Sequence, residues 1–164
     1  MEVTESSVLL LPFTPSSVGV ARRRLVSDLI EAGVYGSTVT DAALVISELL
    51  SNALRHAEPL PGSSLRVAWD VDADSVRLSV SDGGGPTQPE LGEPTQFTTG
   101  GRGLRIVAKL SRRWGTGGDD GCATVWAEVP LRRMTTVAVS AIATESGLRI
   151  WALLGERTLS LRST

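Results

Sequence analysis

Three polar side chains are spaced four residues apart in a stretch that is otherwise apolar. Within residues 41–57, Glu48, Asn52 and His56 follow an i, i+4, i+8 spacing that stacks them on one helix face, and Arg55 lies beside them. A helix that is apolar on its other faces is buried, so this polar strip is predicted to line a cleft. A buried carboxylate and carboxamide need partners, which Mg²⁺ and a phosphate chain would supply. The alternative is a core helix with one solvated edge.

A second candidate site combines a carboxylate with three glycines at the end of a predicted strand. Residues 75–81 alternate between apolar and polar side chains, which predicts a strand. Residues 82–86, Asp-Gly-Gly-Gly-Pro, follow directly and place Asp82 at the mouth of the turn as a hydrogen-bond acceptor. Glycines allow the backbone to approach a ligand closely. The alternative is a flexible turn that binds nothing.

A third candidate site is the turn Gly101-Arg102-Gly103, which precedes a helix predicted over residues 104–113. Glycines that open a helix make an anion site, because free backbone N–H groups and the helix dipole point the same way. The turn is neither a Walker A loop nor a dinucleotide fingerprint, because Gly-Lys-Ser/Thr and G-x-G-x-x-G are both absent. Residues 86–100, rich in proline and glycine, are predicted to form a lid-like loop before it.

Three helices and five strands are predicted to position these groups. An edge strand at residues 8–11 is followed by a first helix that Ser16 or Ser17 caps and Gly33 ends. Thr40 is the predicted N-cap of the central helix. The other strands are predicted at residues 65–70, 75–81, 114–116 and 122–129, with turns at 72–74 and 117–121. One sheet face is apolar and needs the helices as cover.

Composition excludes several classes of function. The net charge of −2 over 164 residues provides no basic surface for nucleic acid or an anionic membrane. Cys122 is the sole cysteine and His56 the sole histidine, which excludes a disulfide framework and a two-histidine zinc motif. No apolar run approaches the ~20 residues of a spanning helix. The acidic start of the chain does not resemble a secretory signal, so a cytoplasmic protein is expected.

The order of the motifs resembles the ATP-binding domain shared by gyrase, heat-shock protein 90, histidine kinases and the mismatch-repair ATPase. Glu48-x-x-x-Asn52 comes first, then Asp82-x-Gly84, then a lid and the glycine turn, and last Gly-x-x-Thr at residues 121–124. The sequence is more closely similar to the anti-sigma factor serine kinases, over about residues 8–131. The phrases that carry this similarity are SELLSNALRHA at 47–57, GRGL at 101–104, RWG at 113–115 and TVW at 124–126.

The resemblance implies a role for each polar residue of the central helix. Glu48 matches the general base that polarises a substrate hydroxyl or a water. Asn52 matches the residue that binds Mg²⁺ through its side-chain oxygen, a ligand type that Mg²⁺ favours. Arg55 falls where relatives place a basic contact to the phosphates.

The resemblance also implies how the nucleotide is held. Asp82 matches the carboxylate that accepts the adenine amino group, Thr124 the threonine that supports it, and Gly84 the glycine against which adenine sits. Pro86 stands where the wider family often has a further glycine, which stiffens the hinge of the lid. The residues that match the phosphate-cradling turn are Gly101, Arg102, Gly103 and Leu104.

The expected fold is an α+β two-layer sandwich, with one mostly antiparallel sheet covered on one face by three helices. The expected function is an anti-sigma regulator that binds ATP and Mg²⁺, phosphorylates a serine or threonine of an anti-anti-sigma protein and sequesters a sigma factor. The alternatives are a nucleotide-gated binding module without kinase activity and, more distantly, a detached histidine-kinase domain. The resemblance also allows a homodimer. Residues 1–133 are assigned to the ATP-binding domain and 134–164 to an extension of unknown structure.

One further feature is the run Arg22-Arg23-Arg24 in the first predicted helix. Three consecutive residues of a helix point in different directions, so at least one arginine must face away from the packed side. The simpler interpretation is a solvated helix face. The alternative is a docking surface for an acidic partner.

Overall fold

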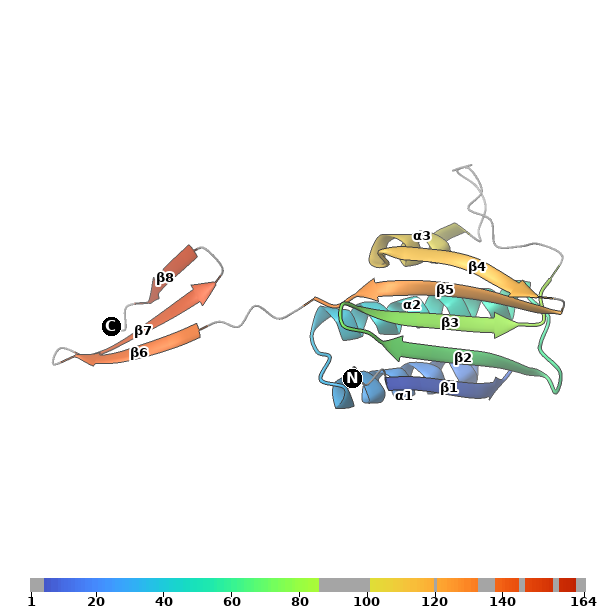
Figure 1. The fold of residues 1–164 in the computed structure, drawn as a ribbon, viewed down its shortest axis with the longest axis horizontal. Helices are drawn as coiled ribbons and strands as arrows, with labels where there is room; N and C mark the ends of the chain where they lie inside the picture. Colours follow the sequence, from blue (N-terminus) through green and yellow to red (C-terminus); the bar gives the residue numbers. More distant parts are fainter. Residues whose placement is uncertain are drawn as a thin grey trace. The chain divides into compact units, whose positions relative to one another are not determined.

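The computed structural model describes residues 5–85, 101–119, 121–132, 138–144, 147–154 and 157–161, which form two compact units, Met1–Arg132 and Arg133–Thr164. The predicted lid at residues 86–100 lies outside the described residues. In chain order, the first unit contains β1 (Glu5–Pro12), α1 (Ser16–Glu31), α2 (Ser37–His56), β2 (Ser64–Val71), β3 (Ser75–Asp82), α3 (Gly101–Leu110), β4 (Arg113–Asp119) and β5 (Cys122–Pro130) (Figure 1).

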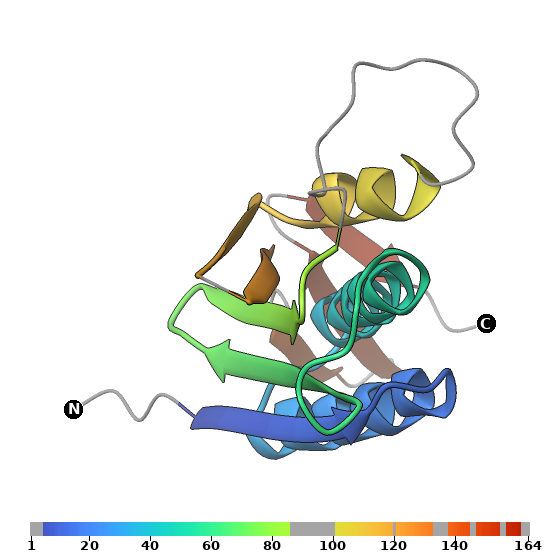
Figure 2. The ribbon, with the colours of Figure 1, turned by 90° about the vertical axis from the view of Figure 1, so that its right-hand side faces the viewer.

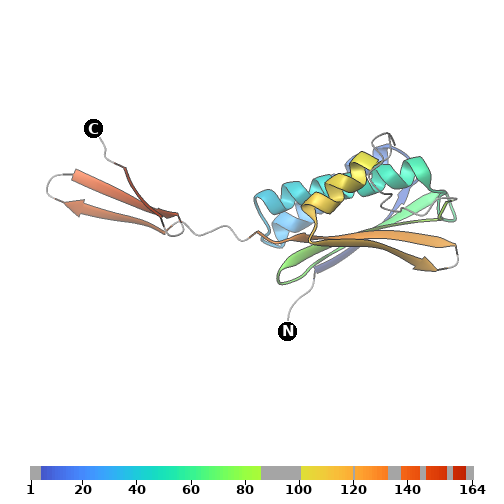
Figure 3. The ribbon, with the colours of Figure 1, turned by 90° about the horizontal axis from the view of Figure 1, so that it is seen from above.

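The first unit is the predicted two-layer sandwich. Its five strands pair antiparallel in the order β1-β2-β3-β5-β4, which confirms that β1 is an edge strand. The three helices lie side by side across one face of this sheet (Figures 2 and 3). Within the described residues, no helix combines the length and apolarity needed to cross a membrane.

The core lies between the helices and the sheet because the strands alternate as predicted. Val76, Leu78 and Val80 of β3 are buried toward the helices, whereas Arg77 between them is exposed. Trp69 of β2 is only 1% exposed and lies opposite Leu78. Each such buried side chain contributes about 1.5–3 kcal/mol relative to an exposed one.

Helix α1 ends where predicted and begins differently. Gly33 has a φ of +78°, the left-handed conformation expected just beyond a helix end. The N-cap is Pro15, without a side-chain capping hydrogen bond, so neither Ser16 nor Ser17 is the cap. The Ser17 hydroxyl instead donates to the Pro12 carbonyl at 2.6 Å, which ties the start of the helix to the end of β1.

Helix α2 begins at Ser37, four residues before the predicted start, so Thr40 is not its N-cap. The extra turn is held by tertiary contacts. The buried Thr38 hydroxyl donates to the Pro130 carbonyl at 3.4 Å and accepts from the Arg132 N–H at 2.9 Å. These contacts join the start of α2 to the end of β5, a restraint that local sequence does not show.

Helix α3 and strand β4 also shift relative to their predicted bounds. The helix begins at Gly101 and ends at Leu110, so Arg113 belongs to β4 rather than to the helix. Arg113 lies directly opposite the buried Glu128 of β5 and forms a forked ion pair with it, with N···O distances of 2.8–3.1 Å. Strand β4 continues through Gly117 and Gly118, which were predicted as part of the turn.

The second unit contains a three-stranded antiparallel sheet in the order β6-β7-β8. Its strands are β6 (Ala138–Thr144), β7 (Gly147–Leu154) and β8 (Arg157–Leu161). These strands belong to the extension, for which the sequence predicted no structure.

Candidate functional site

The fold brings two of the predicted motifs into contact. Glu48 lies on α2 and Gly103 on α3, and a β-carbon added to Gly103 would meet Glu48 Oε2 at 2.7 Å. A real Cβ essentially never comes so close, so a side chain at position 103 would displace the carboxylate. Gly103 and Glu48 therefore lie side by side, although more than fifty residues separate them in sequence.

Asp82 ends β3 as a buried carboxylate, with 5% of the residue exposed. The Gly84 N–H donates to its Oδ1 at 2.8 Å, while Oδ2 has no hydrogen-bond partner among the described residues. Burial raises the pKa of Asp82 above its usual value, and the Gly84 hydrogen bond opposes that rise. A buried acceptor with spare hydrogen-bonding capacity suits a ligand that donates an N–H.

The glycines after Asp82 have two different roles. Gly83 donates its N–H to the Glu58 carbonyl at 2.8 Å, and Gly84 accepts from the Glu58 N–H at 2.6 Å. A β-carbon added to Gly83 would collide with the Pro59 carbonyl oxygen. A β-carbon added to Gly85 would meet the His56 carbonyl oxygen at 2.7 Å. Gly83 and Gly85 thus allow the turn to pack on the end of α2. The sequence had instead predicted that these glycines allow a ligand to approach the backbone.

Gly84 differs from its two neighbours. Its φ is +80°, which disfavours any side chain, and a β-carbon there would have no atom within 4 Å. The contacts of Glu58 and Pro59 are made by their backbones, so no side-chain motif could have indicated them. The paired hydrogen bonds fix the Asp82 turn against the helix that carries Glu48 and Asn52.

Thr124 is not brought to Asp82. Its Oγ1 lies 2.7 Å from Ser81 Oγ, and the two residues are directly opposite in the β3–β5 register. The residue opposite Asp82 is Ala123. Because side chains alternate between sheet faces, Thr124 and Asp82 project from opposite faces of the sheet.

The remaining predicted residues lie on α2 and α3. Asn52 is half-buried one helical turn beyond Glu48, and Arg55 is exposed in the last turn of α2. Gly101 and Arg102 are the first two residues of α3, and Leu104 is half-buried. The N-terminus of α3 therefore opens beside Glu48, a position where its free N–H groups suit an anion.

The residues present fit a nucleotide with Mg²⁺. The Asn52 side chain could supply an oxygen ligand of the kind that Mg²⁺ prefers, and Gly103 leaves space beside the neighbouring Glu48 carboxylate. Among the residues described by the structure, no group of three His, Cys, Asp or Glu side chains could hold a metal. A metal here would depend on phosphate oxygens and water for its other ligands, which is the usual mode of Mg²⁺ at phosphate sites.

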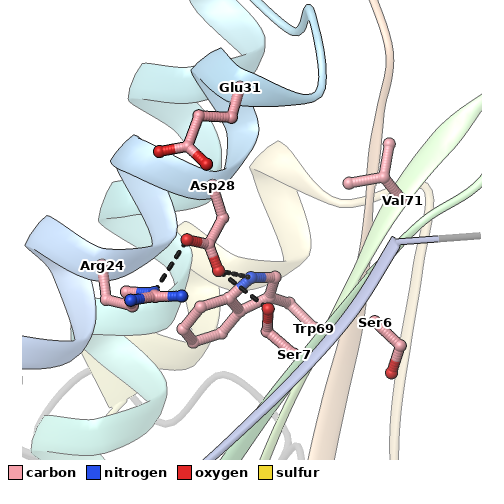
Figure 4. Close-up of a pocket in the computed structure, with 7 residues that line it drawn as sticks. All are labelled: Ser6, Ser7, Arg24, Asp28, Glu31, Trp69 and Val71. Carbon is pink, nitrogen blue, oxygen red and sulfur yellow. Dashed lines mark hydrogen bonds and ion pairs between the residues drawn. The ribbon is translucent and has the colours of Figure 1, made fainter.

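A separate polar cavity of about 250 Å³ lies between α1, β1 and β2 (Figure 4). Asp28 is its centre, because its carboxylate accepts from Ser7 Oγ at 2.8 Å and Trp69 Nε1 at 3.2 Å and pairs with Arg24 Nε at 2.8 Å. Val71, which also lines the cavity, pairs with Val76 near the start of β3, whereas Asp82 ends that strand. The cavity is therefore at the other end of the sheet from Asp82.

The arginine run divides into two kinds of residue. All three arginines are exposed, but only Arg24 forms an ion pair within the described residues, with Asp28. Arg23 extends back along α1, since a β-carbon on Gly19 would meet its guanidinium at 3.3 Å.

Comparison with known proteins gives a family match and structural similarities. The histidine kinase-like ATPase domain matches residues 11–128. The crystal structure of the RsbU and RsbW domains of Rv1364c from Mycobacterium tuberculosis is 24% identical, with a TM-score of 0.62 over 80% of this chain. This chain spans 34% of that protein's chain. The histidine kinase domain of the blue-light activated histidine kinase of Erythrobacter litoralis EL346 is 22% identical, with a TM-score of 0.46, over 70% of this chain and 61% of its own. No curated protein matches the chain.

Proposed function

The chain belongs to the histidine kinase-like ATPase domain family, and on this premise we propose that it is an anti-sigma regulator with protein kinase activity. In this proposal it binds ATP with Mg²⁺ and transfers the γ-phosphoryl group to a serine or threonine of an anti-anti-sigma protein. The observation that carries the proposal is the meeting of Glu48 on α2 with Gly103 on α3, beside a buried Asp82.

Asp82 is the proposed adenine contact. Its Oδ2, which has no partner among the described residues, would accept the adenine amino group, whereas guanine presents an oxygen at that position and would leave two acceptors facing each other. The paired hydrogen bonds between Glu58 and the Gly83-Gly84 backbone hold the carboxylate in place before the nucleotide binds. Thr124 has no part in this contact, because its hydroxyl pairs with Ser81.

The phosphate chain would lie between α2 and the start of α3. The N–H groups at residues 101–104 would donate to phosphate oxygens, and Arg55 would add a positive charge. Asn52 would hold Mg²⁺, which when bound neutralises phosphate charge. Glu48 would accept the proton of the substrate hydroxyl as its oxygen bonds to the γ-phosphorus and ADP leaves.

The partner assignment, a sigma factor and its anti-anti-sigma protein, rests on the sequence phrases around Glu48, Gly101 and Arg113. A structure that contains an RsbW domain shares the fold, which is consistent with this assignment. Cytoplasmic localisation follows from the same proposal.

The test is a phosphorylation assay of the whole chain with radiolabelled ATP and candidate anti-anti-sigma proteins. Label in phosphoserine or phosphothreonine of one candidate is the expected result. ATP binding without label on any candidate that the protein binds would favour the nucleotide-gated binding module. Absence of ATP binding in calorimetry would overturn both functions.

A further inference from the structure

Residues 101–113, which comprise α3 and the start of β4, concentrate positive charge. The whole chain has a net charge of −2, but this segment contains five basic residues and no acidic one. The basic residues are Arg102, Arg105, Lys109, Arg112 and Arg113. Two of them are neutralised by the fold, because Arg112 pairs with Asp74 at 2.9 Å and Arg113 pairs with Glu128 at 2.8 Å.

Two other basic residues, Arg105 and Lys109, form an exposed surface that is here named the basic face. Their i, i+4 spacing stacks them on one side of α3, and both are exposed. Val107, midway between them in sequence, is fully buried, so the basic face lies on the side of α3 away from the core. Among the described residues, neither Arg105 nor Lys109 forms an ion pair.

Folding alone does not explain the basic face. Like charges four residues apart on a helix repel each other. The first turn of α3 has no acidic residue, although the positive end of a helix dipole favours one. A glutamate at position 105 would instead pair with Lys109, in the orientation that stabilises helices best. The positive charges are therefore kept at a cost to the fold, which indicates that they serve an interaction.

We propose that the basic face docks an acidic segment of the protein that accepts the phosphoryl group, an inference that rests on the proposed kinase function. Arg105 is two residues beyond Gly103, which lies beside Glu48. Lys109 is about 6 Å further along the helix, at 1.5 Å per residue. The basic face thus begins at the end of α3 that borders the proposed phosphate site. A carboxylate-rich segment bound there would hold its protein beside that site.

The charge distribution favours an acidic protein over a nucleic acid or an anionic membrane. Arg112 and Arg113 are committed to carboxylates of the fold, which leaves two exposed cations on the basic face. Affinity for a nucleic acid comes from neutralising several phosphates together, and membrane binding needs clusters of basic residues. The net charge of −2 adds repulsion toward an extended polyanion. A short acidic segment needs only the local pair.

The first test reverses the charge of the basic face in the full chain. The Arg105→Glu, Lys109→Glu variant should raise the KM for the acceptor protein at least about tenfold, because it turns attraction into repulsion. Its kcat and ATP affinity should stay within about twofold, because neither side chain touches the reacting atoms. The wild-type KM should also rise with ionic strength, and more steeply than that of the variant.

The matched control is the Arg22→Glu, Arg23→Glu variant. It makes the same change of charge with two exposed arginines on α1, and α2 lies between α1 and α3 (Figure 2). Its KM for the acceptor protein should equal the wild-type value. Equal KM values for the two double variants would overturn the proposal.

The single variant Arg105→Glu separates docking from folding. Its glutamate can pair with Lys109, so the midpoint of thermal unfolding should not fall, whereas the KM for the acceptor protein should still rise. A variant that lost stability together with partner affinity would make Arg105 a structural residue and would overturn its docking role.

Fluorescence anisotropy with a labelled oligoglutamate peptide tests the basic face apart from the kinase reaction. The peptide should bind the Arg105→Glu, Lys109→Glu variant at least about tenfold more weakly than the Arg22→Glu, Arg23→Glu variant. This result in a chain that phosphorylates no protein would support the basic face and overturn the kinase function. Equal binding to both variants would overturn the basic face. Tighter binding of the wild type to duplex DNA or to phosphatidylserine vesicles than to oligoglutamate would overturn the acidic protein partner.

Discussion

At the scale of single residues, Asp82 meets two opposing requirements. Burial of its carboxylate disfavours the charged form, and the Gly84 N–H compensates at one oxygen while the other oxygen has no partner among the described residues. A residue that served folding alone would be better neutral at this position. The raised pKa of a buried carboxyl group at a turn fixed by paired hydrogen bonds is typical of a binding site.

Asp82→Asn is expected to lower ATP affinity at least tenfold. The amide oxygen still accepts from Gly84, but the amide nitrogen is a donor and would face the donating adenine amino group. An unpaired buried polar group costs about 1–3 kcal/mol. Calorimetric titration with ATP measures the change, with Asp72→Asn in the exposed β2–β3 turn as the control. Equal affinities for the wild type and Asp82→Asn would remove Asp82 from the adenine site.

Glu48→Gln separates chemistry from binding. Glutamine keeps the shape of the side chain but cannot accept the proton, so ATP affinity should stay within a few-fold while phosphoryl transfer falls about 10²–10⁴-fold. The exposed Glu31→Gln on α1 is the matched control. Single-turnover transfer to the protein substrate and ATP titration of both variants provide the readouts. Transfer at the wild-type rate would show that Glu48 is not the base.

Gly103→Ala tests the contact between α2 and α3. The added Cβ would meet Glu48 Oε2 at 2.7 Å, and this atom lies at the end of a flexible side chain that can move. We expect a loss of phosphoryl transfer with a change in unfolding free energy below about 1 kcal/mol, as for substitutions that create no cavity or buried unpaired group. Gly117→Ala, where a β-carbon meets no atom within 4 Å, is the control. Full phosphoryl-transfer activity of Gly103→Ala would show that the lack of a side chain at this position is not needed for activity.

At the scale of elements, α1 has one side that packs on the rest of the first unit and one side that is exposed. Asp28 joins α1 to Ser7 of β1 and Trp69 of β2, and it also engages Arg24 (Figure 4). Arg22 and Arg23 are exposed on the same helix. The proposed docking surface is therefore reduced from three arginines to two.

Charge reversal of Arg22 and Arg23 is expected to weaken sigma-factor binding by about 2 kcal/mol or more, since arginine anchors are frequent hot spots of interfaces. ATP affinity should not change. Arg24→Glu instead places a carboxylate beside Asp28 and should lower thermal stability. Titration with the sigma factor and with ATP distinguishes these effects. Unchanged affinity for the sigma factor in the Arg22→Glu, Arg23→Glu double variant would contradict the docking surface and favour the simpler interpretation, a solvated helix face.

At the scale of the whole molecule, the first unit separates its proposed ligand site from its structural contacts. Asp82 and the α2–α3 contact lie toward one end of the sandwich, and the Asp28 cluster lies toward the other. Between the two ends, the inward face of β3 carries the buried apolar side chains of Val76, Leu78 and Val80. The two carboxyl groups with shifted pKa values, Asp82 and Asp74, also lie at opposite ends of β3, because Asp82 ends the strand and Asp74 precedes its first residue.

The pH dependence of folding should reflect this separation. The folded pKa of Asp82 is raised, so its destabilising effect is absent below about 3.8, its unfolded value, and develops as pH rises through the folded pKa. Asp74, whose pKa the Arg112 guanidinium lowers, acts oppositely and stabilises the fold above that value. Asp82→Asn should therefore be more stable than the nucleotide-free wild type at pH 7 and equal to it near pH 3. Denaturant unfolding at both pH values measures the difference; an equal gap at both would contradict the assignment to ionisation.

Sequence alone determined the family, the fold class and the set of polar residues on α2. The i, i+4 spacing of Glu48 and Asn52 on an apolar helix and the alternation of β3 are local patterns, because helix and strand periods fix which side chains share a face. The order of the motifs along the chain then indicated the fold, which the antiparallel sheet and its three helices confirm.

Tertiary structure decided which of those residues meet. The register of β3 with β5 places Ala123 opposite Asp82 and directs Thr124 to Ser81 on the other face. Packing of the Asp82 turn on the end of α2 explains Gly83 and Gly85, and Thr38 extends α2 by a turn. These outcomes depend on contacts between segments that are distant in sequence, and a one-residue change of strand register moves every side chain to the opposite face. No local pattern carries that information.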